Sequence, residues 1–263
     1  MNITLIPGHN PGPYTGAGNN TYLISGRQPT LIDAATGDSR HLDAIGHALG
    51  TSLLTQVLVT HGHSDHAAGS EVIADRWPDA KFIKRPWPDL DRRYMVTWTP
   101  VPEGGEIAAG DSTLQAIHTP GHAPDHLCFF EESARILFCG DLVVQGSTVV
   151  IPVSGGGSLA QYLASLRRIR DLEPARVLPA HGPEIDDLGS LIEYYFDHRR
   201  RREEQVLSVL RAGFATREEL LDRIHPGLSS DLVLAASETI WAHLIKLRDE
   251  GRVREEDGEW FLY

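Results

Sequence analysis

The feature that most constrains this chain is a cluster of metal-binding side chains directly after an apolar strand. The segment Val57–Gly69 contains the string His61-Gly62-His63-Ser64-Asp65-His66, which places four ligand candidates within six positions. At a turn from strand to helix, alternate residues such as His61 and His63 converge on one point, while Asp65 and His66 begin the next turn toward a second point. Imidazole nitrogen and carboxylate oxygen are ligands that zinc favours. The spacing therefore predicts a metal centre rather than a histidine-rich surface turn.

Three further ligand candidates, His122, Asp141 and His181, follow apolar runs that are predicted as strands. In sheets flanked by helices, the loops at the carboxyl ends of strands converge, and the core below them stays dry. Because these residues come after the first string in the same setting, we expect all seven side chains to meet at one edge of the fold.

The body of the chain alternates short apolar runs with amphipathic segments, which is typical of sheets covered by helices. The expected strands are Thr21–Ile24, Thr30–Ile32, Gln56–Val59, Lys81–Ile83, Leu114–Ile117, Leu127–Phe130, Ile136–Phe138 and Arg176–Leu178. The expected helices are Ser39–Leu49, Ala68–Arg76 and Ser158–Leu172.

A different pattern begins after a long helical stretch predicted over Asp187–Arg211. Thr216 and Glu219 form a capping box that opens a short helix, and Ser237–Glu250 repeats apolar residues at helical spacing. Val253–Leu262 is predicted as two strands about a turn. Helix, helix and hairpin outline a winged helix. We therefore divide the chain into a metal-binding domain over residues 1–197 and a winged-helix-like domain over residues 198–263.

The seven ligand candidates resemble the ligand set of the metallo-beta-lactamase superfamily, and the resemblance covers residues 1 to about 190. It implies an α/β fold, the alpha-beta/beta-alpha four-layer sandwich, with two zinc ions. It implies that His61, His63 and His122 hold the first metal, that Asp65, His66 and His181 hold the second, and that Asp141 bridges them. Antibiotic-destroying members mostly carry Cys or Ser at the bridging position and are usually exported. Asp141 and the absence of a readable signal peptide therefore favour the housekeeping hydrolases.

A narrower resemblance spans nearly the whole chain. It rests on Asn19-Asn20-Thr21-Tyr22, Pro120-Gly121-His122-Ala123-Pro124-Asp125-His126, Gly140-Asp141-Leu142 with Ser147-Thr148-Val149, and His198-Arg199 ahead of the winged helix. Together these strings are similar to the lactamase-beta-like protein two subfamily, which includes an animal single-strand endoribonuclease. The resemblance implies metal-dependent hydrolysis, with RNA cleavage as an alternative activity.

Two further histidines are candidates for a role beside the metals. His126 follows a ligand candidate by four residues, and it either orients a ligand or is a hydrogen-bonded core histidine. The resemblance places His198 near the mouth of the cleft, where a substrate contact is the alternative to an ordinary surface histidine. The neighbouring run Arg199–Arg202 is predicted as a solvated helix face paired with Glu203 and Glu204, with contact to an anionic substrate as the alternative.

A Pro-rich insert over residues 76–102 carries Trp77, Trp87 and Trp98. Ordinary loop packing is the interpretation that we favour for these rings. A substrate lid over the site is the alternative.

The charge balance limits the partners. The net charge of −12 argues against a general nucleic-acid coat, because phosphate binding depends on excess Lys and Arg. No apolar run approaches the roughly 20 residues of a membrane span. Cys128 and Cys139 are expected as reduced, buried thiols. We therefore expect a cytoplasmic protein without membrane contact.

The expected mechanism uses two zinc ions that share a water and depress its pKa, so that a metal-bridged hydroxide attacks an acyl carbon or a phosphorus. In this mechanism Asp141 bridges and orients, while Asp65 ligates the second metal and accepts a proton. Both aspartates are therefore candidate catalytic residues. No Ser, Cys or Lys nucleophile is needed.

Three functions remain open at this point. The leading one is a small-molecule hydrolase of an ester, thioester, lactone or lactam, which the acidic surface favours. The second is an endoribonuclease acting on single-stranded RNA, which the subfamily resemblance favours. The third is a DNA-binding, metal-sensing regulator, but the predicted recognition helix Ser237–Glu250 offers two cations against three acids. We therefore interpret the C-terminal module as a structural cap or as the contact of a homodimer.

Overall fold

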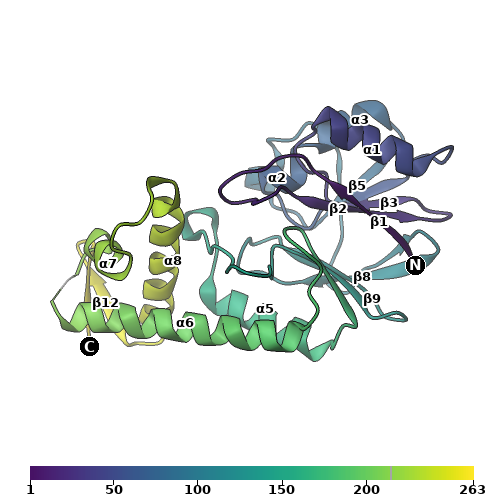
Figure 1. The fold of residues 1–263 in the computed structure, drawn as a ribbon. Helices are drawn as coiled ribbons and strands as arrows, with labels where there is room; N and C mark the ends of the chain where they lie inside the picture. The colour runs from purple at the N-terminus through teal and green to yellow at the C-terminus, as the bar shows by residue number, and fades with distance from the viewer. Residues whose placement is uncertain (214) are drawn as a thin grey trace.

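A computed structural model describes residues 1–213 and 215–263 of the chain. Two sheets lie face to face, helices cover the outer face of each, and a smaller C-terminal domain stands at one end (Figure 1). This arrangement confirms the predicted four-layer α/β sandwich. All eight predicted strands are present within a residue of their expected ranges or inside longer strands.

The first sheet has the strand order β1-β2-β3-β4-β5-β6. Its strands are β1 (Asn2–Pro7), β2 (Asn20–Ser25), β3 (Thr30–Ile32), β4 (Gln56–Leu58), β5 (Lys81–Lys84) and β6 (Trp98–Pro100). The pairs from β1 to β3 are antiparallel, and those from β3 to β6 are parallel. Helices α1 (Ser39–Leu49) and α3 (Ser70–Arg76) cover its outer face, where Ile45 and Ile73 join one buried apolar cluster with Leu31 and Val57 of the sheet.

The second sheet has the strand order β11-β10-β9-β8-β7. Its strands are β7 (Glu106–Ala109), β8 (Ser112–His118), β9 (Leu127–Glu131), β10 (Ile136–Gly140) and β11 (Arg176–Pro179). Helices α5 (Leu159–Asp171) and α6 (Leu188–Arg211) cover its outer face, with Leu166 and Ile192 fully buried against Leu137 and Val177. Ser158 caps α5 by accepting from the backbone of Gln161.

A third apolar cluster fills the space between the two sheets. Leu58 of the first sheet faces Leu114, Phe129 and Phe138 of the second, and all four side chains are at most 1% exposed. Each such burial stabilises the fold by about 1.5–3 kcal/mol. The two sheets are thus held as one unit, and the loops at their carboxyl ends keep a fixed relative position.

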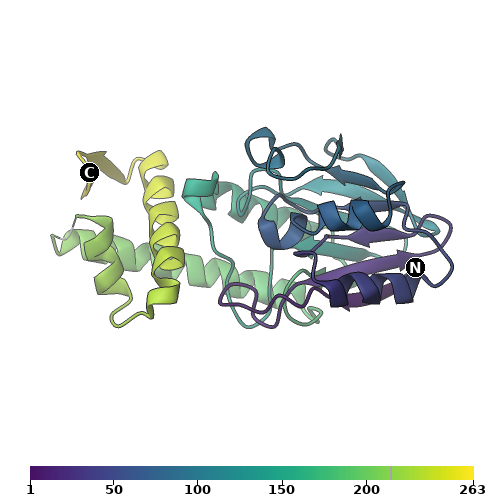
Figure 2. The same cartoon turned by 90° about the horizontal axis from the view of Figure 1, so that it is seen from above.

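The C-terminal domain consists of the end of α6, then α7 (Arg217–Ile224), α8 (Ser230–Asp249) and the hairpin β12 (Val253–Glu256) and β13 (Glu259–Leu262). The predicted capping box at Thr216 and Glu219 is present. The predicted turn lies at Asp257 and Gly258, which both have positive φ. Figure 2, viewed from above, shows α6 running from under the sandwich into this domain.

Two features differ from expectation. Helix α8 begins at Ser230 rather than near Ser237. Leu232, Val233 and Leu234 are consecutive and exposed in its first turns, so they carry no helical period that the sequence could reveal. The predicted domain boundary between residues 197 and 198 falls inside the continuous helix α6, and it stays a prediction.

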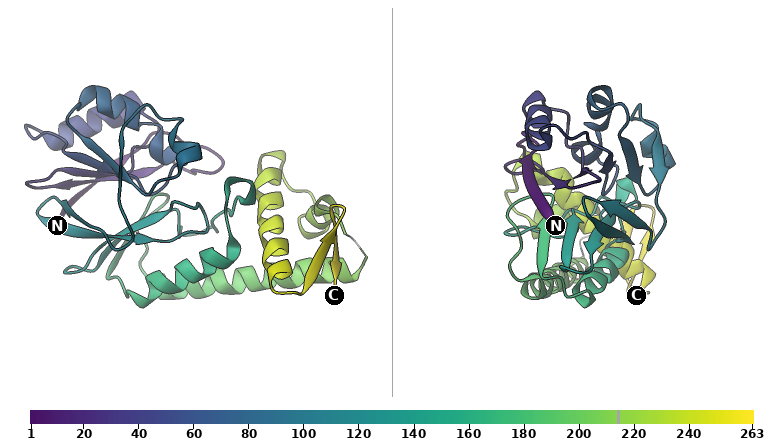
Figure 3. Two further views of the ribbon diagram at one scale, coloured as in Figure 1. Left: turned by 180° about the vertical axis from the view of Figure 1, so that it is seen from behind. Right: turned by 90° about the vertical axis from the view of Figure 1, so that its right-hand side faces the viewer.

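The remaining short helices are α2 (Ser64–Ala67), α4 (Pro88–Asp91) and the 3-10 turn η1 (Val153–Gly155). Seen from behind (Figure 3, left), the C-terminal domain extends sideways from the sandwich. Across residues 1–213 and 215–263, we find no helix with the length and apolar character to cross a membrane. Both cysteines are buried and unpaired, as predicted.

Candidate metal centre

The turn after β4 is anchored to Asp33, the residue that follows the neighbouring strand β3. The carboxylate of Asp33, which follows β3, accepts from the backbone N–H of Thr60 at 2.8 Å and from its hydroxyl at 3.0 Å. The chain then enters α2 through His63, whose carbonyl accepts from the N–H of His66 at 3.0 Å. After this turn, His61 and His63 belong to one group of side chains, and Asp65 and His66 belong to a second group.

The first cluster consists of three imidazoles whose nitrogens converge. His63 Nδ1 lies 2.9 Å from His61 Nε2 and 3.0 Å from His122 Nε2. Burial, together with the other imidazoles, lowers the pKa of His61 well below its usual value and that of His63 to about 3. Both rings are therefore neutral and offer lone pairs, which is the form that binds a metal.

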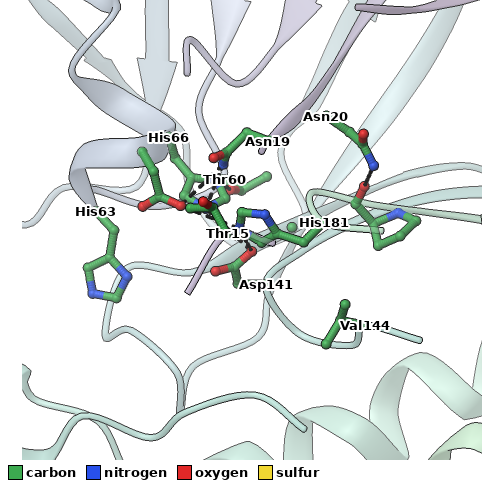
Figure 4. Close-up of polar contacts among 12 residues, drawn as sticks. Thr15, Asn19, Asn20, Thr60, His63, His66, Asp141, Val144 and His181 are labelled. Atoms are coloured by element: carbon green, nitrogen blue, oxygen red, sulfur yellow. Dashed lines mark hydrogen bonds and ion pairs between the residues drawn. The ribbon is translucent and has the colours of Figure 1, made fainter. Parts of the chain in front are cut away.

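The second cluster consists of two carboxylates and two imidazoles: Asp65, His66, Asp141 and His181. His181 Nε2 lies 3.3 Å from Asp65 Oδ2 and 3.2 Å from Asp141 Oδ1, and His66 Nε2 lies at 3.4 Å and 3.3 Å from the same two oxygens. Figure 4 shows His66, Asp141 and His181 pointing toward one another, with His63 to one side.

Asp141 faces both clusters. Its Oδ1 belongs to the second cluster, and its Oδ2 lies 3.5 Å from His122 Nε2 of the first. A carboxylate in this position fits a bridging ligand between two ions. The structure thus brings together all seven predicted side chains in two groups, with Asp141 facing both; their roles as metal ligands and the bridge stay predictions.

The charges of the second cluster fit a cation. Burial disfavours the charged forms of His66 and His181, but Asp141 and the neighbouring carboxylates outweigh it and raise the pKa of His181 to about 10 and that of His66 well above its usual value. The two buried carboxylates thus favour positive charge beside them, which a bound divalent ion would supply. The donor set suits zinc or iron equally in chemical terms.

Two residues beside the ligands were not predicted to belong to the site. Asp33 Oδ2 lies 2.9 Å from His66 Nδ1, which fixes the ring and leaves Nε2 toward the second cluster. Asn19 Nδ2 donates to Asp65 Oδ2 at 3.2 Å. A sequence signal existed for Asp33, because it follows a predicted strand just as Asp141 does.

His126 lies beneath Asp141, fully buried. Its Nε2 accepts from the N–H of Asp141 at 3.1 Å, and its Nδ1 pairs with the hydroxyl of Thr119 at 2.8 Å. Burial lowers the pKa of His126 well below its usual value, so the ring is neutral. It therefore holds the backbone of Asp141, which agrees with an orienting role; that role stays a prediction.

His198 lies on α6 with its ring centroid 6.3 Å from that of Tyr194, and its contact with a substrate stays a prediction. Burial and the adjacent arginines lower its pKa to about 4. The predicted pairing of Arg199–Arg202 with Glu203 and Glu204 is wrong in part. Glu203 pairs with Lys246 and Arg252 instead, and the side chain of Arg199 is buried rather than solvated.

The tryptophans of the insert differ in their surroundings: two pack in or against the core, and one lies beside the first cluster. Trp77 is buried in the core of the first sheet, and Trp98 packs against the same core. Trp87, in contrast, lies with its ring centroid 6.2 Å from that of His63. The hydroxyl of Tyr94 donates to the carbonyl of Gly62 at 2.8 Å. Part of the insert therefore does border the first cluster.

A family model described as the metallo-beta-lactamase superfamily matches residues 14–181, which include all seven clustered side chains. The chain belongs to this superfamily. A second model, described as the beta-lactamase associated winged helix domain, matches residues 216–260. The family and its appended winged helix were both predicted from the sequence, and both predictions are confirmed.

Several relatives match over almost the whole chain. The beta-lactamase-like protein 2 homolog of Caenorhabditis elegans is 32% identical over 271 residues, which cover 99% of this chain and 89% of the relative. The atrochrysone carboxyl ACP thioesterase of Aspergillus chevalieri is 33% identical over 278 residues, covering 99% and 86%. A metallo-beta-lactamase family protein from Thermus thermophilus has the same fold, with a TM-score of 0.84 at 23% identity over 99% of this chain and 98% of that one.

These matches identify the chain as a metallo-beta-lactamase superfamily hydrolase with a cluster of histidines and aspartates that could bind metal.

Proposed function

We propose that this protein is a zinc-dependent hydrolase with a two-ion site, and that its substrate is an acyl compound, first of all a thioester. The observation that carries the proposal is Asp141, whose two oxygens face the two ligand clusters. Esters, lactones and lactams share the carbonyl chemistry of thioesters and stand beside them as substrates. The 33% identical relative named as a thioesterase supports the choice of thioester.

Two divalent ions, when bound, supply Lewis acidity and an activated water at neutral pH. Around them the residues of the chain hold the geometry. Asp33 fixes His66, and Val150 fixes His122 by accepting from its Nδ1 at 2.8 Å. Burial disfavours the charged carboxylate of Asp65, but the charge of His66 and the hydrogen bonds from His181 and His66 outweigh it and hold the pKa of Asp65 well below its usual value. Asp65 is therefore ionised, which is the form that ligates an ion, and its part as a proton acceptor stays a prediction.

A covalent mechanism through a thiol is disfavoured by the surroundings of the two cysteines. Burial raises the pKa of Cys128 to about 12 and that of Cys139 well above its usual value. Both are fully buried, so neither forms a thiolate that could reach a substrate. This supports hydrolysis by direct attack of water.

The test is a panel of substrates offered to the zinc-loaded protein: an acyl thioester of N-acetylcysteamine, a lactone, the lactam nitrocefin and a fluorescent single-stranded RNA. We expect the thioester to be hydrolysed fastest, with activity lost on treatment with a chelator and restored by zinc. Hydrolysis of the RNA alone would contradict the proposal and favour the endoribonuclease. Activity that survives exhaustive chelation would contradict the metal-dependent mechanism itself.

RNA cleavage is the second candidate, favoured by the near-complete match to the protein 2 homologs. The charges of the C-terminal domain argue against it. In α8, Lys246 is paired with Glu203 at 2.7 Å and with Glu250 at 2.6 Å, and Arg248 is paired with Asp249 at 3.0 Å. Cations already paired with carboxylates contribute little to phosphate binding.

We therefore expect the full-length protein to bind a labelled single-stranded RNA only weakly, with a Kd above about 1 μM at near-physiological salt, in the range of non-specific binding. Filter binding at several salt concentrations measures this. Micromolar or tighter binding whose affinity falls steeply with salt would make the endoribonuclease the leading function. The DNA-reading regulator has the same weak recognition helix, and the same assay with duplex DNA tests it. For the oligomeric state we propose a homodimer.

A further inference from the structure

Helix α6 is shared between the two domains. Near its start, Ile192 and Tyr195 are fully buried in the core of the second sheet. Near its end, Val206 and Leu210 belong to the core of the C-terminal domain together with Leu244 of α8. Because α6 is one continuous helix packed into both cores, it fixes the position of one domain relative to the other (Figures 1 and 2).

The segment that follows Asp141, residues 142–150, runs along α5 and α6, and side chains of these helices hold its backbone. The hydroxyl of Tyr162 donates to the carbonyl of Leu142 at 2.7 Å. The hydroxyl of Tyr195 donates to the carbonyl of Val144 at 2.8 Å and accepts from its N–H at 3.0 Å. The guanidinium of Arg199 donates to the carbonyl of Val149.

Arg199 is an unusual member of this set because it is a buried charge. Its residue is 3% exposed, and the guanidinium carbon lies 5.5 Å from the ring centroid of Tyr162. Burying a guanidinium is unfavourable unless its hydrogen bonds and contacts compensate. Its acceptor is a backbone carbonyl rather than a carboxylate, so the contact fixes the position of a peptide.

That peptide leads directly to a metal-ligand candidate. The carbonyl next along the chain, that of Val150, accepts from His122 Nδ1 at 2.8 Å. With Nδ1 as donor, His122 presents Nε2 toward His63. The residue before His122, Gly121, packs so closely on Tyr162 that an added Cβ would lie 2.3 Å from the Tyr162 backbone. This packing restricts the backbone next to His122, so we expect a shift of the Val150 carbonyl to be passed to the His122 ring.

We propose that Arg199 is a positioning residue for the first cluster: it holds the Val149–Val150 peptide and thereby sets the ring of His122, which ties this half of the site to the helix that carries the winged-helix domain. In the second cluster, Asp33 and Asn19 hold His66 and Asp65 from outside the segment 142–150, so we expect Arg199 to act mainly on the first cluster. The inference rests on the proposed ligand role of His122.

The test compares Arg199→Gln with the matched control Arg201→Gln, which removes the same charge from an exposed position two residues along α6. Stepwise zinc affinities of the full-length, metal-stripped proteins are measured against a chromophoric chelator. We expect Arg199→Gln to lower the affinity for one of the two zinc ions by about 10–100-fold, which is the range for partners that orient a ligand. The affinity for the other ion should stay unchanged. Cobalt spectra assign the weakened ion to the three-imidazole cluster. The control should match the wild type at both sites.

A second readout does not involve metal. In the metal-free protein, the hydrogen-bonded Nδ1 proton of His122 should give a downfield imidazole N–H resonance, and Arg199→Gln should broaden or remove it. If Arg199→Gln does not fold, Arg199→Lys keeps the charge and can still donate from its single nitrogen, so it should show a smaller loss of affinity for the same ion. An equal loss of affinity for both ions, or no loss of affinity for either, would overturn the inference. A wild-type protein that does not bind two ions would instead overturn the proposed two-ion site.

Discussion

Replacing Asp141 with alanine should lower the rate of hydrolysis at least about 100-fold, the scale expected when metal ions lose a ligand that fixes their geometry. Asp141 is the residue whose carboxylate approaches imidazoles of both clusters, His66 and His181 in one and His122 in the other. Without it the two halves of the site share no ligand. The measurement is kcat on the best substrate of the panel at saturating zinc.

Metal analysis accompanies that assay. Wild-type protein purified without a chelator should contain close to two ions per chain, and Asp141→Ala should contain fewer. The control is Asp186→Ala, which removes an exposed carboxylate on the loop after β11 and should leave rate and metal content unchanged. Retention of activity within about tenfold in Asp141→Ala would mean that this residue is not a ligand. A clean single iron per chain in the wild type would contradict the zinc site.

The clustering of the seven candidate ligands could be predicted from the sequence because each one follows a strand at the same edge. In a sheet flanked by helices, strand direction and burial alone bring such loops together, so His122, Asp141 and His181 could be located without knowing any distance. The same rule applied to Asp33, which follows β3, would have found the carboxylate behind His66. It was missed because the strings that carry the family resemblance include Asp141 but not Asp33.

The sequence could not predict contacts that depend on how distant segments pack. Arg199 has charged neighbours along the helix, which suggests a solvated face, yet the packing of α6 on the second sheet turns this one side chain inward. The start of α8 was placed too late for a related reason. Its first turns are exposed apolar residues, and neither burial nor periodicity distinguishes them from a loop.

The contact that most clearly escapes sequence reasoning is a buried ion cluster formed by Lys84, Asp91 and Asp125. Lys84 Nζ lies 2.5 Å from Asp91 Oδ1 and 3.0 Å from Asp125 Oδ2, and the side chains of Lys84 and Asp125 are 0% exposed. Burial raises the pKa of Asp125, and the charge of Lys84 opposes the rise. Asp125 precedes His126 and lies near Gly62. The ion cluster therefore joins the insert to the two loops that carry the imidazoles of the first cluster.

We therefore expect Lys84→Met to lower the free energy of unfolding by about 3–5 kcal/mol, because it leaves two carboxylates in the protein interior without their cation. Urea unfolding of the metal-free protein measures this. Lys81→Met, at an exposed position on the same strand, is the control and should change stability by less than about 0.5 kcal/mol. Adding Asp125→Asn to Lys84→Met removes one of the unpaired charges and should recover part of the loss. The recovery is the decisive comparison, because a loss of stability caused only by poorer packing of methionine would not be relieved by neutralising Asp125. A loss in the free energy of unfolding below about 1 kcal/mol for Lys84→Met would show that the buried carboxylates do not depend on this cation.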